Sequence, residues 1–302
     1  MSVAQRLAAD PEVRLTGHLF ERAFGTSPAG VWRAPGGLVL LGGPAAALAV
    51  ALPWGVIIAA APLPSPVVEF YSMNHHSEGF SVGLDELETS VLPEWSRAAA
   101  RALVEAGRPG GLRLVINREL PSETGLLSGA ETICAVGLAV ADLFGVAVPE
   151  SVDPAYAAAR HGRDRGALLV SSGRVDQLPF DLGAAGLRLL VVDPGVVEGL
   201  PGHPSRVGEA VTLLQSGKAA LLGPLLTAAH VRGVPALDLV LDATIDAGGL
   251  GGRAIGQCVV ALVPMAAVGA IRAAVTARLA GVTRRPPRFL TATPAPGAVR
   301  AG

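Results

Sequence analysis

The sequence contains little charge and almost no lysine. Charged residues make up 16% of the 302 residues, lysine occurs once, at Lys218, and the formal net charge is -1. Proteins that bind nucleic acids neutralise phosphates with clustered Lys and Arg side chains. Because the chain has no such basic excess, its composition disfavours a nucleic-acid partner.

Cysteine is also scarce, and the N-terminus lacks an apolar leader. The two cysteines, Cys134 and Cys258, each fall in an apolar pattern that predicts a small core residue. The opening residues, MSVAQRLAADPEVR, carry a charge every few positions and contain no apolar core of a signal peptide. We therefore expect a cytoplasmic protein in a reducing compartment.

No charged residue occurs between Ala34 and Val68. On hydropathy alone this stretch is long enough for a membrane span. However, glycines and prolines divide it into short apolar pieces at 38–41, 45–52 and 56–61. Such pieces are typical of buried strands, so we expect strands of a soluble core and no membrane partner.

Half of the residues are hydrophobic, which suffices for a large core and one or two domains. Helical spacing and caps predict helices at 13–24, 93–106, 124–145, 152–162, 204–215, 217–231, 235–247 and 265–281. Apolar runs predict strands within 31–72 and at 111–120, 186–195, 257–264 and 288–297. This order predicts an α+β protein of two lobes, with one domain at 1–180 and a second at 181–302.

A series of short motifs follows in a fixed order along nearly the whole chain. They are Phe20 to Pro28, Arg33-Ala34-Pro35-Gly36, Trp95, Leu120-Pro121 with Thr124 to Ala130, Val175-Asp176-Gln177, Arg206 to Ala210, Gly223-Pro224-Leu225, Ala247 to Arg253, and Gln257 to Pro264. Each motif is short, but their order resembles the galactokinase-type branch of the GHMP small-molecule kinase superfamily. The resemblance implies a two-lobed GHMP-kinase fold, with a ribosomal-S5-like N-terminal lobe and a C-terminal α+β lobe. It also implies the family activity, which is ATP-dependent phosphorylation of galactose at the C1 hydroxyl.

The resemblance places the ATP phosphates on a glycine-containing loop before a long helix. Backbone N–H groups and the helix dipole attract anions at such a position. Ser128 would also help to hold Mg²⁺, although a Ser here is equally an ordinary helix cap. ATP and Mg²⁺ are therefore the expected cofactors. The expected phosphate-binding residues are Thr124, Gly125, Leu126, Ser128 and Gly129.

The loop departs from the family pattern at three positions. Glu123 stands where the family has Gly, and Leu127 and Gly129 stand where it has Ser. A polyphosphate repels a neighbouring carboxylate unless a metal ion lies between them. Glu123 is thus a candidate metal ligand, and the alternative is a solvent-facing acid that favours the helix start.

Asp176 resembles the catalytic base of the family, which accepts the proton of the sugar hydroxyl. Arg174 lies two positions earlier and is a candidate ion-pair partner. The alternative is a turn Asp with a solvated charge. If Asp176 is the base, it should face the same cleft as Ser128.

The first motif has lost its charged residues. Gly37 stands at the position of the family's catalytic Arg, and Gly43, Pro44 and Ala46 replace the Glu, His and Asp that contact the sugar. Loss of one charged stabiliser commonly lowers the rate on the order of a hundred- to a thousandfold. Arg33 is near in sequence, but its spacing favours an exposed Arg at a strand end.

The third motif is shortened, because Gly252-Arg253-Ala254 runs through Gly256 directly into the strand expected at 257–264. Relative to the family, about four positions are missing from a backbone cradle in which glycines allow close approach to a ligand. This cradle is therefore expected to be truncated.

The histidines carry less information. His75, His76 and Glu78 favour a loop over a metal site, because adjacent side chains of a strand project apart and no further ligand spacing follows. His203 and His230 have no partner at an informative spacing.

These losses predict a pseudokinase or a very weak kinase. Two alternatives stay open: an active GHMP-type small-molecule kinase with an altered substrate, and a protein that binds a nucleotide or metabolite without turnover. In each case the expected ligand is a small molecule, sugar-like or of another kind.

Overall fold

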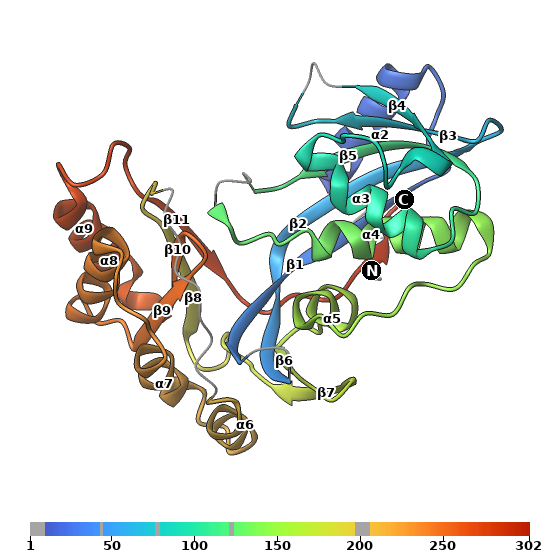
Figure 1. Ribbon diagram of the computed structural model, residues 1–302. Coiled ribbons are helices and arrows are strands. Elements are labelled where there is room, and N and C mark those ends of the chain that lie inside the picture. The colour runs from blue at the N-terminus through green and yellow to red at the C-terminus, as the bar shows by residue number, and fades with distance from the viewer. Residues whose placement is uncertain (1–9, 43–44, 76–78, 121–123, 197–205) are drawn as a thin grey trace.

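The computed structural model describes residues 10–42, 45–75, 79–120, 124–196 and 206–302. They form two lobes, each built on its own sheet (Figure 1). The first sheet has eight strands in the order β12-β1-β2-β5-β3-β4, with β6 and β7 continuing from β2. The second has four, in the order β11-β8-β10-β9. Helices pack on both sheets, which confirms the α+β class.

The first lobe contains the strands β1 (Gly30–Gly42), β2 (Ala46–Leu63), β3 (Val67–Ser72), β4 (Phe80–Gly83), β5 (Gly111–Arg118), β6 (Gly166–Ser171) and β7 (Arg174–Pro179). Its helices are α2 (Pro11–Phe24), α3 (Glu94–Glu105), α4 (Ala130–Phe144) and α5 (Pro154–His161). The charge-poor stretch from residue 34 to residue 68 thus forms strands, as predicted. None of the helices in the described ranges is long and apolar enough to cross a membrane.

The second lobe contains β8 (Leu187–Asp193), β9 (Gly251–Ile255), β10 (Cys258–Pro264) and β11 (Arg288–Ala292). Its helices are α6 (Val207–Gln215), α7 (Leu222–Ala228), α8 (Pro235–Asp246) and α9 (Val268–Leu279). The last strand, β12 (Val299–Arg300), returns to the first lobe and pairs with β1.

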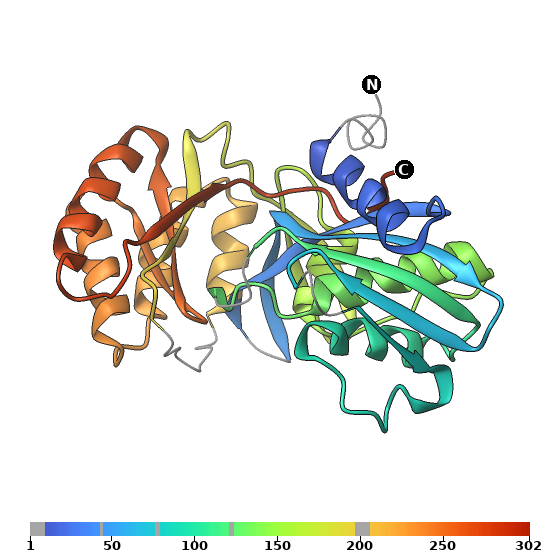
Figure 2. The ribbon, with the colours of Figure 1, turned by 90° about the horizontal axis from the view of Figure 1, so that it is seen from above.

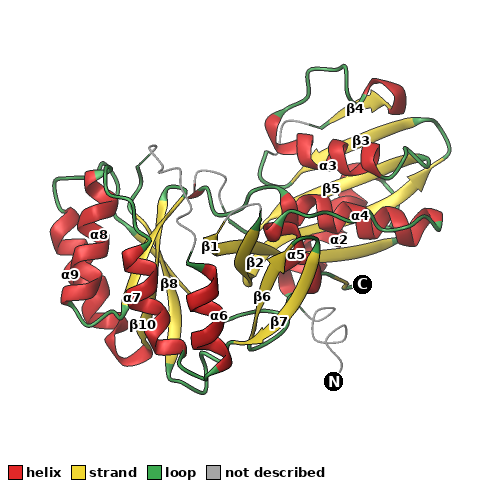
Figure 3. Ribbon diagram, turned by 60° about the horizontal axis from the view of Figure 1, so that its bottom comes forward, coloured by secondary structure: helices red, strands yellow, loops and turns green. Residues whose placement is uncertain are grey.

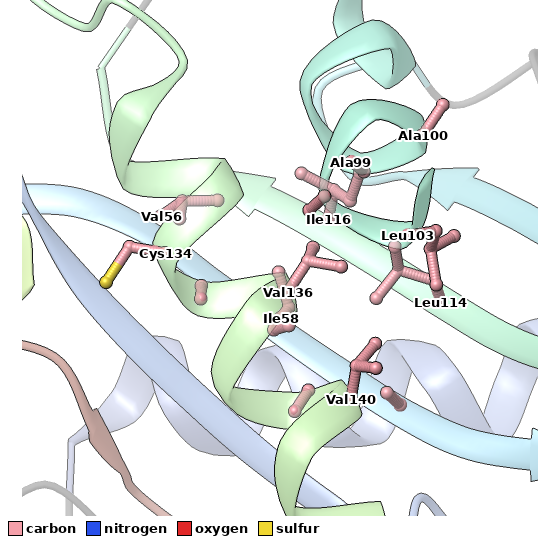
Figure 4. Close-up of a cluster of buried hydrophobic side chains, with 14 of the residues drawn as sticks. Val56, Ile58, Ala99, Ala100, Leu103, Leu114, Ile116, Cys134, Val136 and Val140 are labelled. Carbon is pink, nitrogen blue, oxygen red and sulfur yellow. The ribbon is translucent and has the colours of Figure 1, made fainter. Parts of the chain in front are cut away.

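The first sheet buries both of its faces. Val56 and Ile58 of β2 pack against α3 and α4, in the cluster drawn in Figure 4. The alternate residues Ile57 and Ala59 pack against α2 on the other face. The two-residue period of a strand explains this division, and it explains why β2 is apolar at nearly every position.

Helices also cover both faces of the second sheet, and one of these faces packs against the first lobe. Leu190 of β8 faces α8 and α9, whereas Leu189 and Val260 lie in a cluster with α6 and α7. That cluster also contains Leu48 of β2 and Leu127, so it is a single hydrophobic core shared by the two lobes. We refer to it as the interlobe core.

A C-terminal segment, residues 293–302, crosses from the second lobe back to the first (the red segment in Figure 2). Along its path Ala295 N donates to Ala51 O at 3.0 Å, and Ala298 N donates to Ala159 O at 2.8 Å. At its end Ala301 N donates to the carbonyl of Val31 at 2.7 Å. This C-terminal strap holds α5 against the hairpin of β1 and β2.

Several elements differ from the prediction, among them the strands β4, β6, β7 and β12, which were not predicted from the sequence. The helix expected over 124–145 begins only at Ala130, because Gly125 (φ 62°) and Gly129 (φ 93°) adopt left-handed backbone that ends helical geometry. Strand β9 was not predicted, because its glycines carry low strand propensity. A Cβ at Gly252 would lie 2.5 Å from Val260 O, so only glycine allows this approach of β10.

Candidate active site

The segment before α4 lines the junction of the two lobes. Leu126 and Leu127 are 3% and 8% exposed and belong to the interlobe core. Ser128 is exposed, and its Oγ accepts a hydrogen bond from Ala130 N at 3.4 Å. The loop predicted to hold phosphates thus presents two leucines to the second lobe. The N-cap of α4 is Gly129, which has no side-chain cap hydrogen bond, so the contact of Ser128 with Ala130 N is a local loop contact and the role of Ser128 stays a prediction.

The shortened third motif closes directly onto this loop. A Cβ built on Gly256 would lie 2.8 Å from Gly125 O, and one built on Gly125 would lie 3.4 Å from Gln257 N. Cys258 Sγ donates to Thr124 O at 3.2 Å. The two glycine-containing segments therefore touch through their backbones.

Glu131 places a carboxylate at the start of α4. It is fully buried, and both of its oxygens accept from Gly129 N at 3.2 Å. Burial raises the pKa of this carboxyl group and outweighs the lowering by its own backbone and by Arg118. The Glu131 carboxylate thus accepts a hydrogen bond from Gly129 N, a donor at the helix start that a bound anion would otherwise use.

Arg118, at the end of β5, brings a guanidinium to the same loop. Its Nη2 donates to Leu127 O at 3.3 Å and lies 3.8 Å from Glu131 Oε1. Among the residues that the structure describes, its Nε is buried without a hydrogen-bond partner. This residue was not predicted from the sequence, although its place just before the Leu120-Pro121 match, at the end of a predicted strand, was an available signal.

Gly37 lies against the start of α5. A Cβ built on Gly37 would lie 1.9 Å from Ala155 O and 2.7 Å from Ala155 Cα. Asp153 caps this helix, and its Oδ1 accepts from Ala155 N at 2.7 Å. The resemblance gives position 37 to a catalytic Arg, but the space that its side chain would need is occupied by the backbone of Ala155. The carboxylate of Asp153 is two residues before Ala155 in the chain. The Asp-Pro pair before a helical run was the sequence signal for Asp153.

Asp176 lies elsewhere, on β7, opposite Leu169 of β6. Figures 1 and 3 show β7 at the outer side of the hairpin it forms with β6, away from the start of α4. Among the described residues, no ion pair or side-chain hydrogen bond joins Asp176 to Arg174 or Ser128. The structure does not bring the predicted base and the predicted loop together in any such contact, and the catalytic role of Asp176 stays a prediction.

Arg33 is not the exposed strand-end Arg that its spacing suggested. Its side chain is 20% exposed and forms an ion pair with Glu119 at 2.7 Å. Arg33 Nη2 also donates to Pro53 O at 2.7 Å, and Gly55 N donates to Glu119 at 2.8 Å. The pair therefore fastens β1, β2 and β5 to one another.

His75 and His230 have structural partners. His75 stacks on Trp95 with the ring centroids 6.2 Å apart. His230 Nδ1 accepts from Ala254 N at 3.1 Å, which leaves Nε2 to donate to Asp238 Oδ1 at 2.8 Å. Within these ranges no group of three or more His, Cys, Asp and Glu side chains could hold a metal ion. The predicted metal ligand Glu123 lies outside the described residues, as do His76, Glu78 and His203.

Comparisons with known proteins identify the family. The model of the GHMP kinases N terminal domain matches residues 95–184. Galactokinase of Streptomyces coelicolor is 25% identical over 376 positions, which cover 94% of this chain and 97% of that protein. Galactokinase of Streptomyces lividans is 33% identical over 159 positions, covering 47% of this chain and 40% of the relative. The crystal structure of Lactococcus lactis galactokinase complexed with galactose has the same fold, with a TM-score of 0.80 at 19% identity, covering 96% of this chain and all of that one (100%). The chain is a galactokinase-like member of the GHMP kinase superfamily.

Proposed function

We propose that this protein is a pseudokinase, or at most a very weak kinase, toward galactose. The observation that carries the proposal is the contact between Gly37 and Ala155, because a Cβ on Gly37 would lie 1.9 Å from the Ala155 carbonyl oxygen. A charged side chain cannot occupy the catalytic-arginine position without displacing the start of α5. The sequence has no arginine at position 37, and the packing of α5 leaves no room for an arginine side chain there.

The described residues do not fit ATP with Mg²⁺ in the family manner. Gly125 meets the Gly256 turn, the Gly129 N–H is taken by Glu131, and Leu127 is part of the interlobe core. Each feature removes either space or a donor that a polyphosphate needs. We therefore derive no phosphoryl-transfer step through ATP at this site.

Magnitudes support the same conclusion. Two independent losses of about a hundredfold each would lower a typical turnover number of about 10 s⁻¹ to about 10⁻³ s⁻¹. A remaining general base commonly contributes about 10²–10⁴-fold, and only if it lies within hydrogen-bond reach of the sugar hydroxyl. Such residual activity would fall near the detection limit of an ordinary assay.

The proposal is tested by measuring ADP release from ATP–Mg²⁺ with galactose and a panel of other small alcohols, next to thermal shifts with ATP–Mg²⁺ alone. We expect no turnover above the protein-free blank and no stabilisation by nucleotide. The control variants are Asp153→Asn and Asp176→Ala. Robust turnover that either variant abolishes would overturn the proposal, and would identify which carboxylate acts as the base.

The position of Arg118 favours a second candidate, an active small-molecule kinase with a changed substrate. Its guanidinium lies at the Leu127 carbonyl, and its buried Nε has no hydrogen-bond partner in the described part of the chain. A guanidinium here could supply the charge that Gly37 has lost. In that case some member of the panel should support turnover, and Arg118→Ala should remove it. Binding of ATP without turnover would instead favour a nucleotide-sensing protein.

A further inference from the structure

Strand β7 is an edge of the eight-stranded sheet. It pairs with β6 and with no other strand in the described part of the chain. Leu178 on one of its faces belongs to the interlobe core with α6, and α5 packs on Leu168 and Val170 of β6 from the other face. Helices thus pack on both faces of the hairpin at these residues, whereas Arg174, Val175 and Asp176 are exposed and the backbone edge of β7 has no described strand beside it.

The hairpin geometry determines which backbone groups face that edge. Ser171 pairs with Arg174 across a two-residue turn in which Ser172 (φ 49°) and Gly173 (φ 75°) are both left-handed. In such a turn the first carbonyl accepts the N–H of the fourth residue, so Arg174 bonds inward to β6. Because backbone groups alternate along a strand, the N–H and C=O of Val175 and Gln177 point outward.

The side chains around Val175 are self-complementary in charge. Arg174 and Asp176 flank it, all three are exposed, and Val175 is 37% exposed. If two copies of β7 pair antiparallel about Val175, Arg174 of each copy faces Asp176 of the other. Edge strands that avoid pairing often carry charges that repel a second copy. Here the two charges have opposite sign, so self-pairing would create two attractive cross-strand contacts.

We propose that β7 is a dimerisation edge and that its partner is a second copy of this chain. The two β7 strands pair antiparallel, with Val175 opposite Val175. The N–H of each Val175 donates to the C=O of the other. The pairing joins the two eight-stranded sheets through their hairpins. Because a single short strand pair buries less surface than a standard interface, the dimer is weak and depends on concentration.

The test is sedimentation equilibrium of the whole chain over a wide concentration range. We expect the average mass to rise from 30.5 kDa toward twice that value. Arg174→Asp or Asp176→Arg alone turns both cross-strand contacts repulsive and should raise the dimer Kd at least about tenfold. The double swap of Arg174→Asp with Asp176→Arg restores complementarity and should return the Kd to near that of the unaltered chain.

Two further variants separate pairing from general surface charge. Val175→Pro removes an outward N–H but no bond to β6, so it should abolish the dimer and leave the fold intact by circular dichroism. Arg163→Asp changes an exposed charge before β6, outside the strand, and should leave the dimer unchanged. A chain that stays monomeric at all concentrations, or a dimer insensitive to the swaps and to Val175→Pro, would overturn the proposal.

Discussion

At the scale of single residues, Gly37 shows how neighbouring backbone restricts a position to glycine. Because Ala155 backbone fills the space beside it, we expect Gly37→Ala to lower the free energy of unfolding by about 1–3 kcal/mol or more. Urea denaturation measures this change. Gly208→Ala is the matched control, since no atom lies within 4 Å of a Cβ built there and the residue is in helix α6. Equal stability of the two variants would contradict the packing argument.

The same contact makes a prediction about activity. Gly37→Arg restores the family residue in the sequence but places its Cβ inside the Ala155 backbone. We expect no gain of galactose-dependent ADP release and a larger loss of stability than for Gly37→Ala. A folded Gly37→Arg protein with galactokinase turnover would contradict this expectation, because it would show that the start of α5 can move away from position 37 at little cost in stability.

Glu131 should make the stability of the protein depend on pH. Burial raises the pKa of its carboxyl group in the folded state, so the folded chain binds this proton more tightly than the unfolded chain. The resulting stability is fully present below the unfolded pKa and is lost as the pH rises through the folded pKa. We expect Glu131→Gln, which keeps an acceptor for Gly129 N, to remove this decline.

The measurement is the free energy of unfolding from about pH 4 to about pH 8, the range that brackets an ordinary and a raised Glu pKa. The stability of Glu131→Gln relative to the unaltered chain should increase with pH. Glu209→Gln, at an exposed position of α6, should run parallel to the unaltered chain. Parallel curves for Glu131→Gln as well would show that the buried acid does not control stability in this range.

At the scale of elements, most helices and strands could be predicted because their apolar residues repeat with a clear period. Helix α3 begins at Glu94, after Pro93, where Pro and an acid predict a start. Strand β9 could not be predicted, because its glycines are required by the backbone of α7 and β10, which the sequence does not place. For the same reason, the buried position of Glu131 and the contact between Gly125 and Gly256 could not be predicted from local pattern.

The C-terminal strap is an element whose contribution can be measured. Its last residues supply hydrogen bonds from Ala301 N to Val31 O and from Val31 N to Gly302 O, at 2.7 and 2.8 Å. Arg300 also lies 5.2 Å from the Trp32 ring centroid. At about 1 kcal/mol for each hydrogen bond and each ring contact, removal of residues 299–302 should destabilise the chain by about 2–4 kcal/mol. Thermal unfolding of the shortened chain measures this loss, and an unchanged midpoint would contradict it.

At the scale of the whole molecule, the interlobe core couples the two lobes. It contains Leu48 and Leu127 from the first lobe together with Leu189 and Val260 from the second. Separation of the lobes would expose this apolar surface to water, at about 25 cal/mol for each Å². The sequence predicted two lobes but not this fusion, because Leu126 and Leu127 were assigned to a phosphate loop instead of a core.

We therefore expect the two lobes to unfold in one transition. Trp32 and Trp95 lie in the core of the first lobe, whereas Trp54 packs against the interlobe core. Fluorescence measured in a Trp54→Phe background therefore reports on the first lobe alone. In a Cys134→Ala background, thiol labelling reports on the second lobe through Cys258, which is fully buried and whose burial raises its pKa to about 12. The two signals should change at the same urea concentration, which is the criterion for a two-state transition.

The coupling can be tested from the second lobe. Leu241 lies in the core of α8 and α9, in a cluster separate from the interlobe core, and Leu241→Ala should cost about 2–5 kcal/mol there. If the lobes unfold together, this substitution shifts the tryptophan midpoint of the first lobe by the same amount as the labelling midpoint of Cys258. A tryptophan midpoint that does not move, while Cys258 becomes reactive at lower urea, would show that the second lobe opens alone. The interlobe core would then be a contact between independent domains, and an opened state in which the loop before α4 is free to meet a ligand would be accessible to the native protein.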